Sequence, residues 1–305
     1  MSDTILSRLR APQGVVDAVL DTDTFNEIDD QFALSYMLRS TERINTRAIY
    51  AAPFFNENSS SPEDGMLKSY EEIKTLLKLA NREDLIPCAF EGSRRYLPDE
   101  KTPVDSPAAR DLAARAAEYS PEHPLYVVGI GAITNVASAL LLNPAIAENI
   151  VVVWLGGHSL EWPDTNEFNM MQDVAAARVV FSGAAVVQLP CMGVVDRFTL
   201  TEPELHYWLL GKSALCDHLA NATIEAAHRY AKGKPWSRVI WDVTAVAWLL
   251  NDNDRFMNSR IIPAPIPQYD HHYSLDPRRA PLRYVWNIKR DALMADLIAK
   301  LTNCL

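Results

Sequence analysis

The stretch Val15–Leu38, VVDAVLDTDTFNEIDDQFALSYML, places four aspartates between a strand-like segment and a helix-like segment. Residues 15–20 form a short, largely apolar run of strand length, and the apolar residues between Phe32 and Met37 recur at helical spacing. These aspartates are Asp21, Asp23, Asp29 and Asp30. Ligands of open α/β sheets bind outside the carboxyl ends of the strands, and acids gathered there repel one another unless a cation or shared protons relieve them. The stretch therefore predicts a site for a hard metal ion at the end of the first strand.

Strand-like runs alternate with helical patterns along the rest of the chain. The runs cover residues 47–51, 87–90, 126–128, 149–155 and 185–189. This alternation predicts an α/β fold with a mostly parallel central sheet and helices on both faces. The Pro-rich segment 261–286 predicts small antiparallel or edge additions near the C-terminus, before a closing helix at 290–301. We expect one domain spanning residues 1–305, since α/β folds often reach this size as a single unit.

Composition limits the classes of partner. The formal net charge of -10 argues against binding to nucleic acid or to anionic lipid, because both require a basic face. No stretch is apolar for long enough to span a membrane, and the N-terminus lacks the features of a signal peptide. The four cysteines show no CxxC spacing. We therefore expect a cytoplasmic protein with a small-molecule partner, and the sequence leaves open whether copies of the chain assemble.

The carboxylates suit a hydrolytic metal site. Ca²⁺ takes six to eight hard oxygen ligands. A further carboxylate beside the ion is well placed to remove a proton from water, because the cation lowers the pKa of that water. Acids near a helix start also cap the helix. Capping accounts for one or two of these residues but not for Asp21 and Asp23 at a strand end, so the metal-site interpretation is favoured.

The segment DTDTFNEIDD resembles the nucleoside hydrolase family, whose first strand carries Asp-x-Asp, a short turn and then Asp-Asp at a helix start. The turn is longer here than the Pro-Gly form usual in the family. Other segments resemble the family in the same order along nearly the whole chain: Asn56 after the second strand, GIGAITN around Ile130, EFN at Glu167–Asn169, and the late Asp242. Each match is weak alone, but their shared order supports the resemblance.

The resemblance implies a calcium-dependent hydrolase of an N-ribosyl or related glycosidic bond. It implies that calcium is held by Asp23, Asp30, Asp242 and the backbone carbonyl of Ile130. It also implies that Asp29 deprotonates the attacking water. The sugar hydroxyls are then expected to contact Asn56, Glu167 and Asn169.

The main departure from the family is Trp241, because many members carry a His there that helps the nucleobase leave. An indole cannot donate a proton as an imidazolium does. His158 and His228 are candidate replacements, and Trp241 or Trp162 could stack on a ring. Of these, Trp241 and His228 are the expected substrate contacts. Glu161 and Trp162 also stand near the place where the family offers another sugar-binding Asn.

Two alternatives compete with this interpretation. The segment Asp21–Thr24, DTDT, also resembles the opening motif of haloacid dehalogenase-like phosphatases, in which Asp21 would be a nucleophile. The chain lacks a later Lys followed by a paired-acid motif suited to Mg²⁺, which weakens that alternative. The second alternative is a non-catalytic sugar or nucleoside binder that kept the metal and diol contacts, for which Trp241 is the best support.

Overall fold

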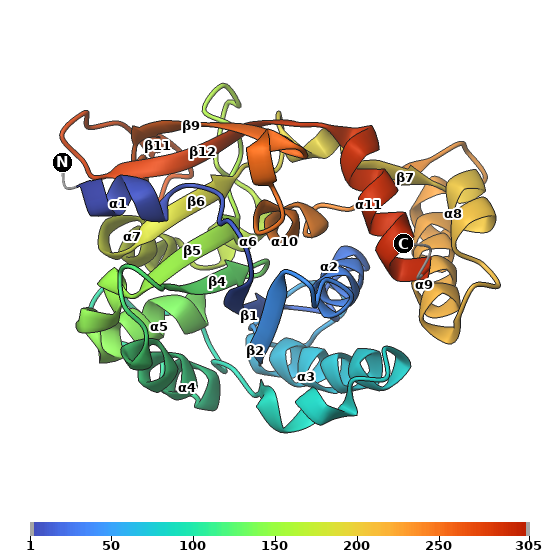
Figure 1. Ribbon diagram of the computed structural model, residues 1–305, viewed down its shortest axis with the longest axis horizontal. Helices are drawn as coiled ribbons and strands as arrows, with labels where there is room; N and C mark the ends of the chain where they lie inside the picture. Colours follow the sequence, from blue (N-terminus) through green and yellow to red (C-terminus); the bar gives the residue numbers. More distant parts are fainter. Residues whose placement is uncertain (1–2, 303–305) are drawn as a thin grey trace.

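An eight-stranded sheet forms the centre of the structure, a computed structural model that describes residues 3–302 (Figure 1). In spatial order the strands are β3 (Ala89–Phe90), β2 (Ile44–Ala51), β1 (Val16–Thr22), β4 (Leu125–Gly129), β5 (Ile150–Leu155), β6 (Ala185–Leu189), β12 (Pro281–Ile288) and β9 (Met257–Pro263). Neighbouring strands pair in parallel except β12 and β9, which are antiparallel. The predicted mostly parallel sheet is confirmed.

Helices cover both faces of the sheet. The α-helices are α1 (Asp3–Arg8), α2 (Asp29–Leu38), α3 (Pro62–Leu79), α4 (Pro107–Arg115), α5 (Thr134–Leu142), α6 (Phe168–Gln172), α7 (Val174–Gly183), α8 (Glu202–Trp208), α9 (Ala214–Ala231), α10 (Val243–Trp248) and α11 (Arg290–Thr302). In Figure 1, α4, α5 and α7 lie to the left of the strands, and α2, α10 and α11 to the right. Along β5, Val152 and Trp154 join the core on one side, whereas Val151 and Val153 join the other. Burial on both faces explains why this strand shows no polar alternation.

Two helices begin at Ser-Pro pairs. The Ser61 hydroxyl accepts a hydrogen bond from the Asp64 amide at 3.1 Å at the start of α3. The Ser106 hydroxyl accepts one from the Ala109 amide at 3.1 Å at the start of α4. In each case proline occupies the first helical turn, where its missing N–H costs nothing. These caps fix where the loops after β2 and β3 end.

The C-terminal segment builds the far edge of the sheet. β9 pairs antiparallel with β12, and β10 (Ile266–Pro267) pairs antiparallel with β11 (Tyr273–Ser274), which confirms the predicted additions. β12 also pairs in parallel with β6, a contact that the sequence did not predict. Leu282 and Tyr284 join the core on one face of the sheet, and Val285 joins the core on the other. β12 is therefore an integral strand of the main sheet rather than an appendage.

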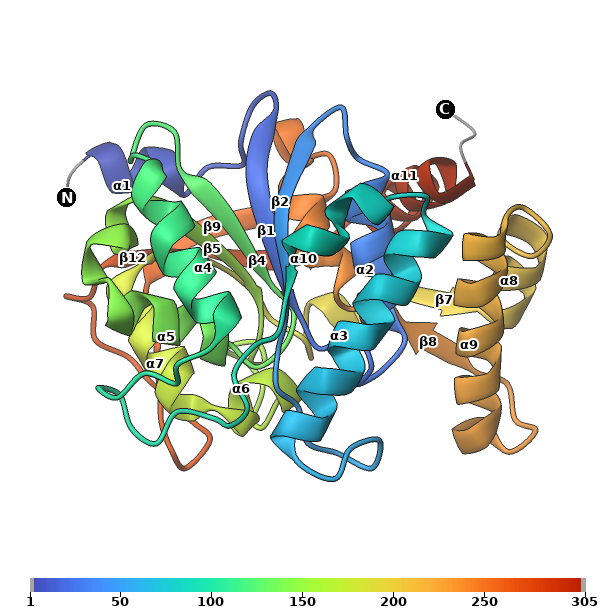
Figure 2. The same ribbon diagram turned by 90° about the horizontal axis from the view of Figure 1, so that it is seen from below.

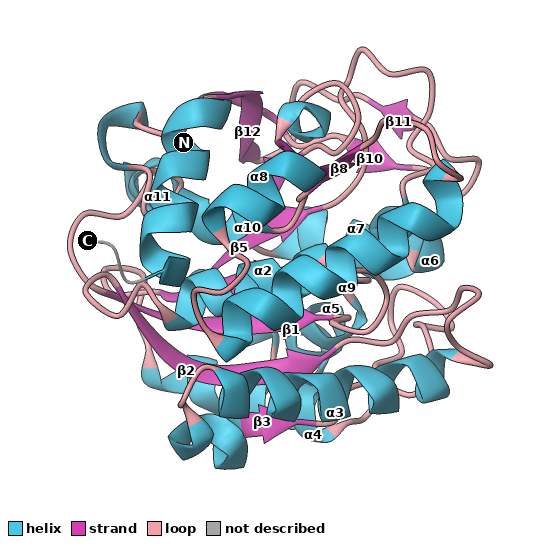
Figure 3. Cartoon of the chain, turned by 90° about the vertical axis from the view of Figure 1, so that its right-hand side faces the viewer, coloured by secondary structure: helices cyan, strands magenta, loops and turns pink. Residues whose placement is uncertain are grey.

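An excursion between β6 and α10 projects from the main body. The short strands β7 (Thr199–Thr201) and β8 (Ser237–Val239) pair antiparallel at its base and enclose α8 and α9 (Figure 2). The view in Figure 3 looks onto α8 and α9, with α3 lying beside α9. His218 on α9 contacts Glu72 on α3, with 3.0 Å between Nε2 and Oε1. No helix of the described residues is both long and apolar enough to cross a membrane.

The strand order identifies the place where a ligand is expected. β2 and β3 follow β1 on one side, and the chain then crosses to β4, β5 and β6 on the other side. The carboxyl ends of parallel strands beside such a reversal form a crevice that binds ligands in open α/β sheets. β1 and β4 are neighbours, with Asp21 opposite Gly129. Asp23 follows β1 and Ile130 follows β4, so both lie at this crevice.

Candidate active site

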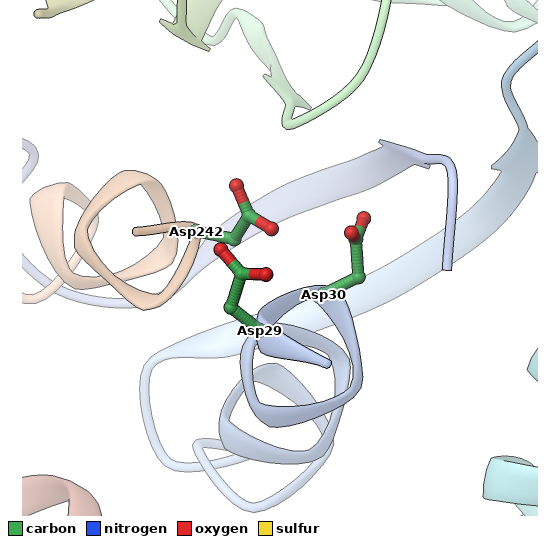
Figure 4. Close-up of side chains that lie close together, drawn as sticks. All are labelled: Asp29, Asp30 and Asp242. Carbon is green, nitrogen blue, oxygen red and sulfur yellow. The ribbon is translucent and has the colours of Figure 1, made fainter. Parts of the chain in front are cut away.

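Three buried carboxylates meet where α2 and α10 begin. Asp29 and Asp30 occupy the first turn of α2, and Asp242 immediately precedes α10. One oxygen from each lies within 4.8 Å of the others, and Figure 4 shows the three side chains side by side at the ends of their helices. The two helices pack against each other, which brings Asp242 to the pair from a distant part of the chain. The structure therefore assembles the acids that the sequence assigned to one site.

Asp23 lies beside this cluster, with 0% of its surface exposed. Both of its carboxylate oxygens lack a hydrogen-bond partner among the described residues. A Cβ at Gly131 would come within 2.9 Å of Asp23 Oδ1, so the loop after β4 can pass this carboxylate only because residue 131 is glycine. A buried carboxylate without partners is costly unless it binds a cation. Asp23 and the three neighbouring acids thus fit a hard divalent cation.

The acids in this cluster hold their protons more tightly than usual. Burial, together with the charge of Asp29, raises the pKa of Asp30 to about 8, against a hydrogen bond from the Thr22 hydroxyl. Burial is also the main cause that raises the pKa of Asp23 and of Asp242 well above the ordinary range, and the neighbouring carboxylates add to it. Burial raises the pKa of Asp29 as well, but the positive charge of Arg238 opposes that effect. A bound cation would favour the ionised forms of all four acids.

Asp21 does not line the cavity but holds together the segments that do. Its Oδ1 accepts a hydrogen bond from Asn135 Nδ2 at 2.8 Å, and burial raises its pKa to about 7. Asn135 also donates to the Ala51 carbonyl at 3.1 Å and accepts from the Ser93 amide at 2.7 Å. Asp21 and Asn135 therefore connect β1, the end of β2 and the loop after β3.

A cavity of about 330 Å³ opens beside the carboxylates. It brings together eight of the ten residues predicted from the sequence: Asp29, Asp30, Asn56, Ile130, Glu167, Asn169, Trp241 and Asp242. Asp23 is buried against the cluster rather than lining the cavity. His228 lines a separate hollow, where it contacts Glu202 at 3.3 Å and packs edge-on against Trp236. The geometry gives His228 no contact with this cavity.

Glu167 and Asn169 already make several hydrogen bonds. The Glu167 carboxylate accepts from the amides of Gly157, Asn169 and Met170 at 2.8–2.9 Å, and thereby caps α6. Asn169 Nδ2 donates to the carbonyls of Ile130 at 3.1 Å and Leu155 at 3.0 Å, so it joins the ends of β4 and β5. A carbonyl oxygen has two lone pairs, and Ile130 keeps one for another partner.

The lengthened turn between β1 and α2 contributes two residues that the sequence analysis did not assign. Asn26 and Glu27 both line the cavity. The Asn26 side-chain oxygen accepts from Asn56 Nδ2 at 2.5 Å, and its backbone carbonyl accepts from Asn58 Nδ2 at 2.8 Å. Glu27 accepts a hydrogen bond from Arg238 on β8. The extra length of this turn could have indicated these residues, because residues inserted next to a site are placed where they can line it.

The loop after β5 supplies two more lining residues: Asn166, which the sequence did not assign to the site, and His158, a candidate replacement for the missing histidine. Asn166 lines the cavity directly before Glu167, in the region where the sequence offered only Glu161 and Trp162. Glu161 is exposed instead and lies 3.7 Å from Arg260. His158 lines the cavity and packs edge-on against Trp162, with ring centroids 5.8 Å apart. Asn166 could have been found from the sequence, because it directly precedes the EFN motif.

A family comparison agrees with the site. The model of the inosine-uridine preferring nucleoside hydrolase family matches residues 18–276, and the chain belongs to this family. It is a glycosidase that acts on N-glycosyl compounds, and enzymes of this family depend on a metal ion. The matched range includes every acid of the cluster.

Relatives and solved structures extend this result. The chain is similar to a pyrimidine-specific ribonucleoside hydrolase, RihA, from Escherichia coli O9:H4 (strain HS), with 27% identity over 73% of this chain and 76% of that protein. RihA from Enterobacter sp. (strain 638) is 25% identical over 76% and 78%. The fold is similar to that of a plant nucleoside hydrolase, PpNRh1, with a TM-score of 0.73 and 18% identity over 94% of this chain and 99% of that one.

The phosphatase alternative is not favoured. Asp21 would have been the nucleophile, yet its side chain binds Asn135 and does not line the cavity. The family match instead covers the acids and the EFN motif together.

Proposed function

We propose that this chain is a calcium-dependent hydrolase of N-ribosyl bonds in which Asp29 removes a proton from the attacking water. The observation that carries the proposal is the buried group of four carboxylates beside a cavity of about 330 Å³. Asp23, Asp30, Asp242 and the Ile130 carbonyl would hold the ion, since all four are hard oxygen ligands of the kind that Ca²⁺ prefers. When bound, the cation supplies Lewis acidity that lowers the pKa of water and coordinates neighbouring hydroxyls of a sugar.

The protein residues then bind and orient the two reactants. Asp29 lines the cavity next to Asp30 and Asp242, so its carboxylate lies within reach of a water on that side of the sugar. The positive charge of Arg238 opposes the rise in its pKa, which keeps Asp29 closer to the ionised form that a base requires. Asn56, Asn166 and Asn169 line the cavity with amide groups that suit sugar hydroxyls.

A turnover screen tests this proposal. The metal-free protein would be assayed on ribosides with and without added Ca²⁺, and Mg²⁺ would serve as the comparison ion. We expect cleavage only with a divalent cation, and Asp29→Asn should lower kcat by about 10²- to 10⁴-fold.

Binding measurements separate catalysis from recognition. Because Asp29→Asn keeps the shape of the side chain, a ribose-containing ligand should still bind to it in calorimetry. Binding without turnover by the calcium-loaded parent protein would instead support the non-catalytic binder. The relatives named as ribonucleoside hydrolases make ribosides the first compounds to screen.

A further inference from the structure

The cavity is acidic at its exposed rim as well as at its buried end. Glu27 and Glu57 are exposed lining residues, whereas the acids of the cluster are buried. Within residues 3–302, no lysine or arginine lines the cavity. Arg238 lies close by but donates its hydrogen bond to Glu27. A lining of this sign attracts cations and repels anions.

The same cavity lacks an evident proton donor for a leaving ring that must be protonated. His158 Nδ1 accepts a hydrogen bond from the Met192 amide at 3.3 Å, and burial lowers the pKa of His158, so its imidazole is neutral near pH 7. Trp241 lines the cavity but can donate only a hydrogen bond through its indole N–H. Burial raises the pKa of Glu27 to about 7, but the hydrogen bond from Arg238 and a cation bound at the neighbouring acids would favour its ionised form, which donates no proton. A leaving ring that receives no proton must therefore be stable as an unprotonated product.

We propose that this site, in its proposed role as an N-ribosyl hydrolase, takes substrates whose departing ring carries a fixed positive charge, such as an N-ribosylpyridinium. The oxygen of water bonds to C1′ of the ribose while the C1′–N bond breaks. The bonding electron pair passes to the ring nitrogen and cancels its charge, and the proton of the water passes through Asp29 to solvent. The products are ribose, a neutral pyridine and one released proton.

Two lining residues suit such a ring. Trp241 is half-buried, and an indole face attracts a cationic ring through its quadrupole. Glu57 adds a negative charge at the exposed rim. A neutral pyridine gains neither attraction, so the product is held less tightly than the substrate. The charge of the lining therefore favours both capture of the substrate and release of the ring.

The experiment compares substrates on the full-length, calcium-loaded protein. The compounds are ribosyl-3-carbamoylpyridinium, its 5′-phosphate, inosine and uridine. We expect kcat/KM for the pyridinium riboside to exceed that for inosine and uridine by at least about 100-fold, since general acid help is worth about 10²- to 10⁴-fold. The anionic 5′-phosphate should react less well than the riboside, and one proton should be released per turnover of the pyridinium riboside.

The outcomes separate this inference from the proposed function. A preference below 100-fold would overturn the charge inference and leave ribosyl hydrolysis intact. If the calcium-loaded protein cleaved none of the ribosides, the proposed function itself would fail, and the inference with it.

Variants separate recognition by this site from the intrinsic lability of pyridinium ribosides. Glu57→Gln should raise KM for the pyridinium riboside by about twofold to fivefold, the size expected for an exposed charge pair. It should leave KM for a neutral nitrophenyl riboside unchanged, and the effect should shrink in high salt. Glu118→Gln is the matched control, because Glu118 is exposed and precedes the amino end of β4, whereas the cavity lies at the carboxyl ends of the strands. Equal effects of Glu57→Gln on both substrates would overturn the proposal.

The last arm tests for a hidden acid. His158→Gln and Glu27→Gln should each lower kcat on inosine or uridine by less than tenfold, because we infer that neither side chain donates a proton to a leaving ring. A larger loss on these substrates in either variant, with kcat on the pyridinium riboside unchanged, would show that the cavity does supply an acid, which contradicts the inference.

Discussion

The side-chain amide of Asn56 donates a hydrogen bond to the side-chain oxygen of Asn26 at 2.5 Å. This contact joins the loop after β2 to the turn between β1 and α2, and both residues line the cavity. Asn26 is therefore a positioning residue for Asn56, since it fixes which way the Asn56 amide faces. The turn that lengthens the opening motif thus has a structural role beside the sugar-binding residues.

Removal of that contact should weaken substrate binding. A hydrogen bond of this kind contributes about 0.5–1.5 kcal/mol, so Asn26→Ala should raise KM by about twofold to tenfold with a smaller change in kcat. Steady-state kinetics on a cleaved riboside measure both constants. Asn45→Ala is the control, because Asn45 is exposed and bonds Asp17 away from the cavity. A fall in kcat at constant KM would assign Asn26 a different role.

Calcium affinity should depend on acids from both helices. Asp242→Asn and Asp23→Asn should each weaken Ca²⁺ binding by on the order of 100-fold or more, because even residues that only orient metal ligands are worth about 10- to 100-fold. Calorimetric titration of the metal-free protein measures this. Asp270→Asn, an exposed acid in the loop between β10 and β11, should bind Ca²⁺ as the parent does. Parent-like affinity in Asp242→Asn would remove that residue from the ligand set.

The stability of the metal-free protein should fall as pH rises. The pKa of Asp30 is about 8 in the folded chain, against an ordinary value of 3.8, so the folded state binds more protons than the unfolded state between these values. The free energy of unfolding therefore decreases with rising pH, by at most about 1.4 kcal/mol per pH unit for one such group.

Thermal unfolding at pH 6 and pH 8 tests this dependence. We expect a lower Tm at pH 8 without metal and a smaller loss in Asp30→Asn, with Asp270→Asn as control. Saturating Ca²⁺ should remove most of the difference, because the cation replaces the protons. An equal slope in Asp30→Asn and the parent would contradict the assignment.

A histidine at position 241 should widen the range of leaving groups. Trp241→His places an imidazole beside Asp242 at the cavity wall, so an ordinary nucleobase could receive a proton. We expect kcat on inosine or uridine to rise by about tenfold or more, short of the full 10²- to 10⁴-fold because the pocket is not adapted to the ring. Trp241→Phe controls for lost bulk. An equal gain in both variants would show that space, not proton donation, limits these substrates.

The sequence predicts most of the fold, because its signals are local. The Ser61 and Ser106 caps, the apolar run of β5 and the acids that flank the first helix all act within a few residues of themselves. The pairing of β12 with β6 is different. The apolar, Pro-interrupted sequence of this segment does not specify which strand it pairs with. Its partner is decided by packing between distant parts of the chain.

The site shows the same division. Asp29 and Asp30 are evident from the spacing after β1, whereas the position of Asp242 beside them depends on α10 packing against α2 and came from the family resemblance. Asn26 and Asn166 were missed, since a lone Asn in a loop carries no periodic signal. His228 was assigned to the substrate, but the excursion between β7 and β8 carries it to another hollow.

The wide separation of Asp30 and Asp242 along the chain governs the order of events in folding. Their carboxylates meet only after α10, near the end of the chain, has packed against α2 near its beginning. Contacts of such high sequence separation form late, because a long loop must close before they contribute. An ion held by both residues cannot nucleate the fold. It binds only after the chain has folded and stabilises the folded state, so it slows unfolding far more than it speeds folding.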